Sequence, residues 1–303
     1  MTRGPASRRA RRYVAAVAVT FGVMVAGTPA HAGTLDPIIQ ILPPRHVPYH
    51  PSTALACVDG SPSCIDATIQ RMQASYESLA HTCNHDAVFA LAYLRVTENV
   101  RDALDHGLFA DQVWLRNLDA EFAKDYFDTL ANWNSGHRDR VPEAWRIALQ
   151  AADDGSVTAL GNFMLAMNAH INRDFSFVLA SAGLTAKDGT SHKPDHNAYN
   201  PRLDSIYKPV FAEEAKEFDP TFDDINIGPV DDEAVGAIMR VWREIVWRNA
   251  EALSLAETPA AKAAAANRIE SYAAAQAKLY RQMFASSPTK TAVRDAYCEA
   301  QHH

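Results

Sequence analysis

The sequence predicts an all-α protein: a single multi-helix domain of about eight helices behind an irregular, Pro-rich N-terminal arm. Two observations support this prediction. Apolar residues recur at spacings of three and four in almost every segment after Ser63, which is the period of a helix with one buried face. No segment shows the alternation of a half-buried strand, and no repeat of fixed period is present.

The first 32 residues resemble a secretory signal peptide. Arginines precede an apolar run at 13–25, and the small-residue exit Ala30-His31-Ala32 follows. We expect cleavage after Ala32 and a secreted or extracytoplasmic protein. The apolar run is short for a membrane span, so no stable span is expected after cleavage; the alternative is an uncleaved anchor.

Charge restricts the classes of partner. Removing residues 1–32 would take away five Arg and no acidic residue, which changes the formal net charge from −7 to −12. Such a chain is not expected to bind nucleic acid, and an anionic membrane surface is not favoured as the main partner. A small-molecule substrate or ligand is compatible with it.

After the leader, residues 33–62 form the expected Pro-rich arm and residues 63–303 the helical domain. The helices are expected in the following order: 63–82, 84–107, 111–136, 142–155, roughly 157–182, about 205–217, 233–256 and 260–286. Polar loops at 186–204 and 218–232 interrupt the pattern and are long enough to shape a site.

Four cysteines follow the signal, which in an exported protein indicates two disulfides. Four cysteines allow three connectivities. We favour Cys57–Cys64, which closes a small loop, and Cys83–Cys298, which ties the last helix to an early one. No CxxC pair is present, so a cysteine metal site is disfavoured.

The helix at about 157–182 carries the strongest chemical signal. Helical spacing places His170 and Asp174 on the same apolar stripe as Phe163, Met167 and Phe177. A buried carboxylate needs a partner. Three interpretations are open: a structural polar cluster, a metal site with His170 and Asp174 as ligands, and a general base, His170, oriented by Asp174.

Glu98 is the best candidate for a further metal ligand or catalytic carboxylate. It interrupts the apolar stripe of the helix at 84–107, with Tyr93 nearby as a candidate ligand-binding residue. The alternative for Glu98 is a surface ion pair with Arg95 or Arg101.

Three further polar residues are candidate ligand-binding groups. Asn168 and Asn172 form a second i,i+4 pair beside the His170–Asp174 pair. His196 lies in the polar loop at 186–204, and loops on a rigid scaffold often carry function.

The segments VFALAYLRVTE, VPEAW, MNAHINRD and WREIVWRNAEAL occur in this order. They resemble an uncharacterised actinobacterial family of domains of unknown function, marked by a helix reading MNAHINxD. The resemblance covers roughly residues 67–283 and implies one intact domain. No activity follows from it.

The spacing of His170 and Asp174 is also similar to the HxxxD helix that binds zinc in secreted helical phosphoesterases of the phospholipase C and P1 nuclease type. Those enzymes use an N-terminal Trp and a later HxxxD or HxxxE pair as ligands. Here the expected mature start is Gly33-Thr34-Leu35, and no later pair follows. The likeness therefore implies at most a mono- or dinuclear site.

Three functions remain open. The first is a metal-dependent, phosphoesterase-like hydrolase in which His170, Asp174 and Glu98 bind a divalent metal such as zinc. The second is a metal-free enzyme or small-molecule-binding protein that uses the His–Asp pair. The third is a non-catalytic exported domain. The chain lacks GxSxG, HExxH, P-loop and GxGxxG motifs, and its paired cysteines leave no thiol nucleophile.

Overall fold

A computed structural model describes residues 42–222 and 231–303 of the chain. These residues form a single helical domain, and their only β-type pairing is two isolated bridges. The expected signal peptide and the first part of the arm lie outside the described residues. The all-α prediction is confirmed.

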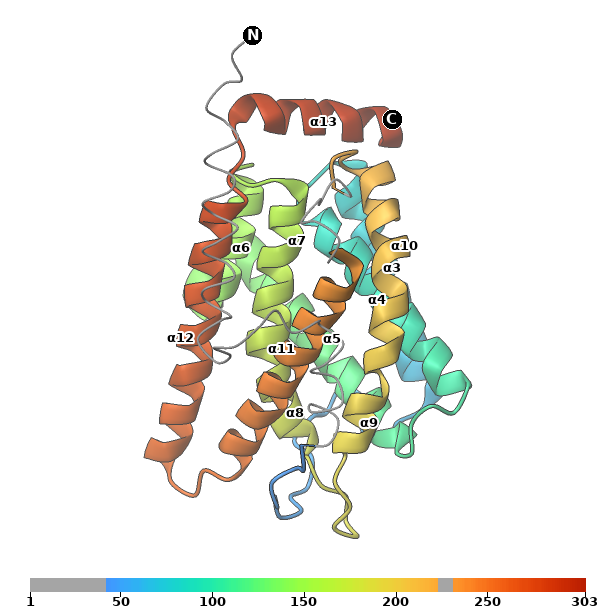
Figure 1. The fold of residues 1–303 in the computed structure, drawn as a ribbon, viewed down its shortest axis with the longest axis vertical. Helices are drawn as coiled ribbons and strands as arrows, with labels where there is room; N and C mark the ends of the chain where they lie inside the picture. The colour runs from blue at the N-terminus through green and yellow to red at the C-terminus, as the bar shows by residue number, and fades with distance from the viewer. Residues whose placement is uncertain (1–41, 223–230) are drawn as a thin grey trace.

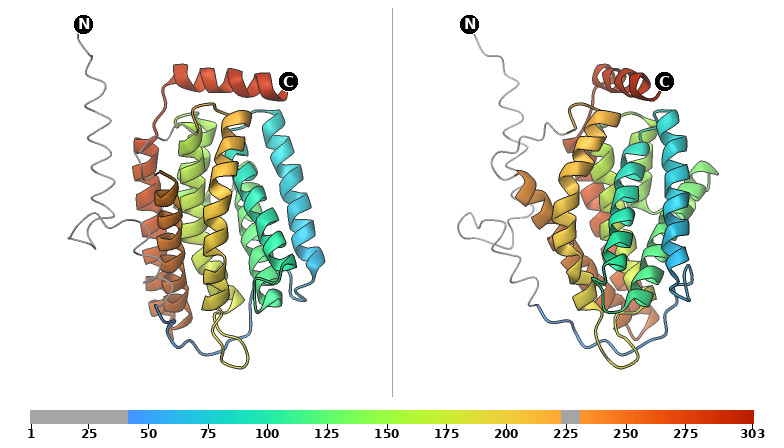
Figure 2. Two further views of the ribbon diagram at one scale, coloured as in Figure 1. Left: turned by 45° about the vertical axis from the view of Figure 1, so that its right-hand side comes forward. Right: turned by 90° about the vertical axis from the view of Figure 1, so that its right-hand side faces the viewer.

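The helices are arranged as one bundle (Figure 1). In chain order they are α3 (Pro62–His81), α4 (Ala87–Asp105), α5 (Gln112–Asn134), the 3₁₀ turn η2 (Arg138–Arg140), α6 (Glu143–Asp153), α7 (Ala159–Met167), the π-helix η3 (Asn168–Phe175), α8 (Ser176–Ala182), α9 (Lys193–Ala198), α10 (Asn200–Glu217), α11 (Asp231–Ser254), α12 (Pro259–Met283) and α13 (Pro288–His302). The longer helices run along the bundle, and α13 lies across one end (Figure 2).

Local signals explain where several helices begin and end. The Asp111 carboxylate accepts the N–H of Trp114 at the start of α5, and the Thr158 hydroxyl accepts the N–H of Gly161 at the start of α7. Just after α4 and α6, Gly107 and Gly155 have φ of +68° and +56°, a conformation that favours glycine.

Two helices were not predicted. Helix α9 lies inside the segment expected to be a loop, and α13 follows the last expected helix; α10 also begins at Asn200 rather than near 205. Each of the three has a proline in its first turn. Proline is well tolerated there because the first N–H groups of a helix need no intrahelical partner. Pro194, Pro201 and Pro288 therefore mark the starts of helices.

The two disulfides are the predicted ones. Cys57 is bonded to Cys64, and Cys83 is bonded to Cys298, which fastens α13 to the chain between α3 and α4. Disulfides are typical of proteins in extracellular or other oxidising compartments. No helix within the described ranges is long and apolar enough to cross a membrane.

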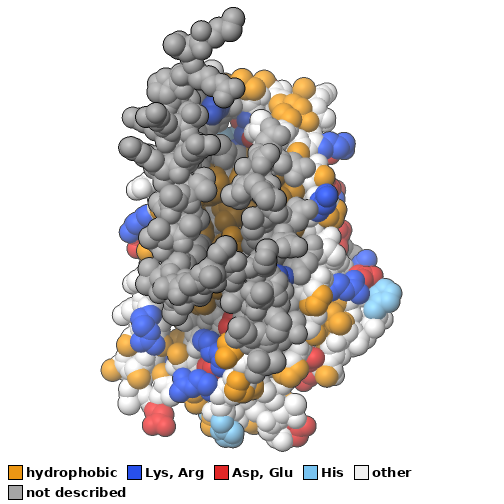
Figure 3. Space-filling view, in the orientation of Figure 1, with side chains coloured by type: hydrophobic (Ala, Val, Ile, Leu, Met, Phe, Trp, Pro, Cys, Tyr) orange, Lys and Arg blue, Asp and Glu red, His pale blue; other side chains and the backbone are white. Residues whose placement is uncertain are grey.

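The described part of the Pro-rich arm lies against the bundle. The backbone N–H groups of Thr53 and Ala54 donate to the carbonyl of Ser181 at the end of α8, and Ala54 is fully buried. Charged side chains of both signs are interspersed over the face shown in Figure 3.

Candidate functional site

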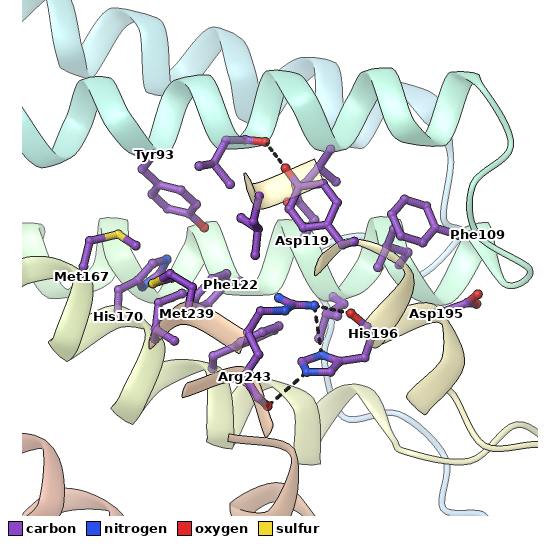
Figure 4. Close-up of a pocket in the computed structure, with 18 of the residues that line it drawn as sticks. Tyr93, Phe109, Asp119, Phe122, Met167, His170, Asp195, His196, Met239 and Arg243 are labelled. Atoms are coloured by element: carbon purple, nitrogen blue, oxygen red, sulfur yellow. Dashed lines mark hydrogen bonds between the residues drawn. The ribbon is translucent and has the colours of Figure 1, made fainter. Parts of the chain in front are cut away.

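A cavity lies between α4, α5, η3, α9, α10 and α11. It offers about 90 Å³ to the centres of water-sized molecules, which is several times what one water needs. Most of the groups around it are apolar or aromatic, and the polar ones enter from different helices (Figure 4). The lining residues are Phe89, Tyr93, Val96, Val100, Phe109, Leu115, Leu118, Asp119, Phe122, Met167, His170, Ile171, Phe175, Asp195, His196, Tyr199, Leu203, Tyr207, Met239 and Arg243.

His170 and Asp174 form a buried pair at one end of the cavity. The His170 Nδ1 atom lies 3.3 Å from Asp174 Oδ2, and Asp174 is completely buried. The same carboxylate accepts hydrogen bonds from the indole N–H of Trp145 at 2.7 Å and from Arg173 at 2.9 Å. Because a carboxylate only accepts hydrogen bonds, the network assigns the imidazole proton to Nδ1.

The other imidazole nitrogen of His170, Nε2, is free to contact a molecule in the cavity. Nε2 is buried and has no hydrogen-bond partner. The ring stacks on Phe122 with centroids 3.6 Å apart and an interplanar angle of 3°, which fixes its orientation. Burial lowers the pKa of His170, so the free protein holds a neutral imidazole with a lone pair at Nε2.

The π-helix determines which side chains share this face. Met167, Ile171 and Phe175 line the cavity at spacings of four, and His170 lies among them. Phe177 does not lie on this face, because it packs on the separate cluster of Leu253, Ala265 and Ile269. The expectation that Phe177 continues the His170 stripe is therefore wrong. A π-helix has a wider turn than an α-helix, and such turns are frequent at functional sites.

Two oxygen groups of residues that line the cavity have no hydrogen-bond partner within the described residues. The Tyr93 hydroxyl and the Asp119 Oδ2 atom are buried and make no hydrogen bond. Burial raises the pKa of Asp119 to about 7 and raises that of Tyr93 well above its ordinary value. At neutral pH, Tyr93 carries a proton, and Asp119 is close to its midpoint.

The pKa of Asp119 makes stability depend on pH. Its folded pKa lies near 7 and its unfolded pKa near 3.9, so its contribution is lost as pH rises from about 4 through 7. Relative to wild type, Asp119→Asn should therefore gain roughly 2–3 kcal/mol in unfolding free energy between pH 5 and pH 8. Urea denaturation at the two pH values measures this difference. Asp128→Asn, an exposed change on the same helix, should show no such gain, and an equal gain there would refute the assignment.

Arg243 enters the cavity from α11, on the side of His196 (Figure 4). It is buried, its Nε donates to Asn200 Oδ1 at 2.7 Å, and its Nη2 donates to the carbonyl of His196. The ring of His196 is held in turn, because its Nε2 donates to the carbonyl of Arg243 at 3.1 Å. Burial lowers the pKa of Arg243 to about 10, so it remains a cation at neutral pH.

Comparison with known proteins places the chain in a family. A family model described as "Family of unknown function (DUF5995)" matches residues 65–283, which is most of the chain. The chain belongs to the DUF5995 family. No curated protein and no solved structure matches it. The MNAHINxD hallmark and the HxxxD likeness to zinc phosphoesterases are not tested by this match and stay predictions.

The DUF5995 match contains every residue that lines the cavity. Helix α13 and Cys298 lie beyond its end, and Cys57 and Cys64 precede its start. The cavity therefore belongs to the family domain itself.

In this DUF5995 chain, the candidate residues Tyr93, His170 and His196 line the cavity, and Asp174 is hydrogen-bonded to His170; their functional roles stay predictions. Asn168 and Asn172 are buried but do not line it. The Asn168 amide donates to the carbonyl of Ala273 on α12, and the Asn172 amide donates to Asn168 Oδ1. Asn168 thus connects η3 to α12, and Asn172 supports Asn168 from the same helix.

The structure does not bring Glu98 to this site. Its carboxylate accepts a hydrogen bond from Arg95 at 2.9 Å, and Arg95 also pairs with Glu213 of α10. Of the two alternatives considered for Glu98, the pair with Arg95 is the one formed. A metal bound by His170 would need ligands other than Glu98.

Within the described residues, the only group of three His, Cys, Asp or Glu side chains whose ligand atoms all lie within bridging distance is Cys57, Asp59 and Cys64. The two sulfurs of this group are bonded to each other, so they are not available as thiolate ligands. The predicted set of His170, Asp174 and Glu98 is not gathered in this way.

Asp119 and Arg243 were missed by the sequence reasoning, although the signal that selected Glu98 could have found both. Asp119 interrupts the apolar stripe of Leu115, Leu118 and Phe122, with which it lines the cavity. Arg243 interrupts the stripe of Met239, Val246 and Ala250 in the same manner. An ionisable residue on a buried helix face was the informative pattern in each case.

Proposed function

We propose that this protein binds a small, predominantly apolar organic molecule in the cavity and that His170 acts on it as a general base. The observation that carries the proposal is the buried, unpartnered Nε2 of His170, which lines the cavity while Nδ1 is anchored to Asp174. This is the geometry expected of a base oriented by a second group.

The unpaired polar atoms argue for an absent ligand. Buried donors and acceptors are nearly always hydrogen-bonded, and each one left alone costs about 1–3 kcal/mol. Tyr93, Asp119 and His170 each present such an atom among the largely apolar residues that line the cavity. A ligand with one or two oxygen groups would provide the missing partners, and the aromatic walls would cover its apolar body.

The same groups define the chemistry available. Nε2 of neutral His170 can accept a proton from an O–H or C–H group of the ligand, and the Asp174 carboxylate would stabilise the imidazolium that forms. The protonated Tyr93 hydroxyl can donate a hydrogen bond to an oxygen on which negative charge develops. A proton transfer of this type needs only groups that the chain itself supplies.

The zinc hydrolase considered from the sequence is the competing function. His170 Nε2 is a suitable metal ligand in its own right. However, both oxygens of Asp174 are engaged by Trp145, Arg173 and His170, and Glu98 lies outside the cavity lining. The acid–base proposal uses His170 and Asp174 in the pairing that the structure gives them.

Filling the cavity should remove ligand binding. The neutral apolar dye N-phenyl-1-naphthylamine should bind the mature, untagged protein, and Leu118→Trp, which places an indole in the cavity lining, should weaken binding at least about tenfold. Fluorescence titration measures this. Val113→Trp is the matched control on the same helix, because Val113 is 52 % exposed and does not line the cavity. Equal loss in both variants, or no binding by wild type, would reject the proposal.

The role of His170 has its own readout. Nitrogen NMR of the imidazole should show a protonated Nδ1 and a bare Nε2, with the Nε2 signal shifting when the dye is added. Elemental analysis of the same sample decides the competing function. A stoichiometric metal that is lost in folded His170→Gln would overturn the acid–base role in favour of a metal centre.

A further inference from the structure

Arg243 is a buried cation whose hydrogen-bond partners among the described residues are all neutral. Its Nε and Nη2 atoms donate to an amide oxygen of Asn200 and a backbone carbonyl of His196, and its Nη2 lies 3.5 Å from the Nδ1 atom of His196. In the parts of the chain that the structure describes, no carboxylate lies within ion-pair distance of it. The nearest aromatic faces, of Phe175 and Tyr199, have centroids 5.7 and 5.9 Å from its guanidinium carbon.

Two of the carboxylates nearby are committed to other groups, and the third, Asp119, lines the cavity without an ion pair to Arg243. Asp195, which also lines the cavity, accepts the backbone N–H groups of Ala110 and Asp111 at 2.8 Å each. Glu244, the next residue on α11, pairs with Lys193 at 2.8 Å and with Arg248 at 2.7 Å. Within residues 42–222 and 231–303, Arg243 therefore differs from Lys193 and Arg248 in having no ion-pair partner.

Such an arrangement is costly unless something else completes it. A buried charge without an opposite charge is strongly unfavourable, and neutral hydrogen bonds offset only part of this cost. A planar guanidinium is well suited to bind a carboxylate through two parallel hydrogen bonds. Because Arg243 lines the cavity, an anionic group of the ligand can reach it.

The cavity also indicates the length of the ligand. A row of stacked or tilted rings runs from His170 to His196, the residue whose carbonyl accepts a hydrogen bond from Arg243. The ring centroids of His170 and Phe122 are 3.6 Å apart, and those of Phe122 and Phe175 are 4.7 Å apart. The centroids of Phe175 and His196 are 5.5 Å apart. The phenyl rings of Phe122 and Phe175 thus lie between the His170 ring and the His196 ring beside Arg243. A ligand that contacts both His170 and Arg243 needs an apolar body of several carbons.

We propose that the ligand is an apolar monocarboxylate, such as an arylalkanoate, whose carboxylate pairs with Arg243 while its apolar body lies along Phe175 and Phe122 toward His170. This rests on the proposed function, because it requires that the cavity hold a small molecule. A phosphate ester is disfavoured, because a dianion would meet a single uncommitted cation in an apolar enclosure. The proton removed by His170 would then lie on the part of the ligand remote from the carboxylate.

The experiment compares 4-phenylbutanoate with 4-phenylbutan-1-ol, which share a carbon skeleton and differ in charge. Each is used to displace N-phenyl-1-naphthylamine from the mature protein at pH 7.5, with calorimetry as a second measurement. We expect the carboxylate to bind wild type at least about tenfold more tightly than the alcohol, as a charge-assisted pair implies. Arg243→Gln should abolish this preference and leave alcohol binding within about threefold.

The controls separate the two proposals. Arg281→Gln changes an arginine paired with Asp154 on the surface and should keep the wild-type preference. If the dye binds wild type but the carboxylate displaces it no better than the alcohol does, the carboxylate proposal is overturned and the cavity proposal stands. If the dye itself does not bind, the proposed function fails first. The wild-type comparison decides the matter even if Arg243→Gln does not fold.

Discussion

Replacing Asp174 with alanine should lower the free energy of unfolding by about 3–5 kcal/mol, because it leaves buried partners without their charge. Asp174 is completely buried and accepts hydrogen bonds from Trp145, Arg173 and His170. The alanine side chain supplies none of these bonds, and a small cavity replaces the carboxylate. Chemical denaturation measures the loss of unfolding free energy. Thermal denaturation should show the same loss as a fall of roughly 10 °C in Tm.

Asp128→Ala is the matched control for this change. Asp128 is exposed and pairs with Lys124 one turn away, so its loss should cost less than about 1 kcal/mol. If Asp174→Ala costs no more than the control, the carboxylate is not the centre of the network. Asp174→Asn adds a chemical test, because the amide can donate to His170 and would move the imidazole proton from Nδ1 to Nε2, which abolishes the base.

Removing the disulfide between Cys83 and Cys298 should be equally damaging. The bond joins positions 215 residues apart, and closing so long a loop restricts the unfolded chain by about 5 kcal/mol. In the folded state, α13 is also held by Arg294, which donates to Asn162 Oδ1 at 2.7 Å, and by a His85–Asp295 pair at 2.8 Å, so the disulfide acts together with these contacts. The double variant Cys83→Ser/Cys298→Ser should unfold at much lower urea concentration than wild type.

The second disulfide provides an internal comparison. Cys57 and Cys64 are only 7 residues apart, so replacing both should cost about 2–3 kcal/mol. Hydrogen exchange adds a local measurement: amides of α13 should lose protection in the Cys83–Cys298 variant and keep it in the other. Equal costs for the two pairs would show that loop length does not govern their contribution.

The fold could be predicted from the sequence wherever a single helix buries one face. The apolar residues of α3, such as Ile65 and Met72, recur at helical spacing and were sufficient to predict that helix. The positions of the four cysteines were sufficient to predict the two disulfides. The prediction was wrong where a proline can indicate either a loop or the first turn of a helix. Pro194, Pro201 and Pro288 each begin a helix, whereas the sequence alone gives proline as a loop signal with equal force.

The site was predicted in part for a different reason. His170 and Asp174 are neighbours on one helix, so their pairing followed from spacing alone. Asp119 and Arg243 face them from α5 and α11, and the relation between residues on different helices depends on how the bundle packs. Glu98 shows the same limit, since Arg95 is bound by Glu213 of α10 as well as by Glu98, and no local pattern reveals that contact.

The π-helix has a consequence for the tolerance of the chain to length changes. Each residue of an α-helix turns the chain by roughly 100°, so an eight-residue π-helix shifts the angular phase of everything that follows it. Helix α8 carries Phe177, which packs on the Leu253 cluster, and Ser181, which receives the arm. An ordinary α-helix over the same eight residues would rotate α8 away from both, whereas deleting one residue between 168 and 175 would largely compensate for the loss of the wider turn. The wider turn of η3 thus sets the angle between the side chains that line the cavity and the outer contacts of α8, and a change in length is tolerated only where the type of turn changes with it.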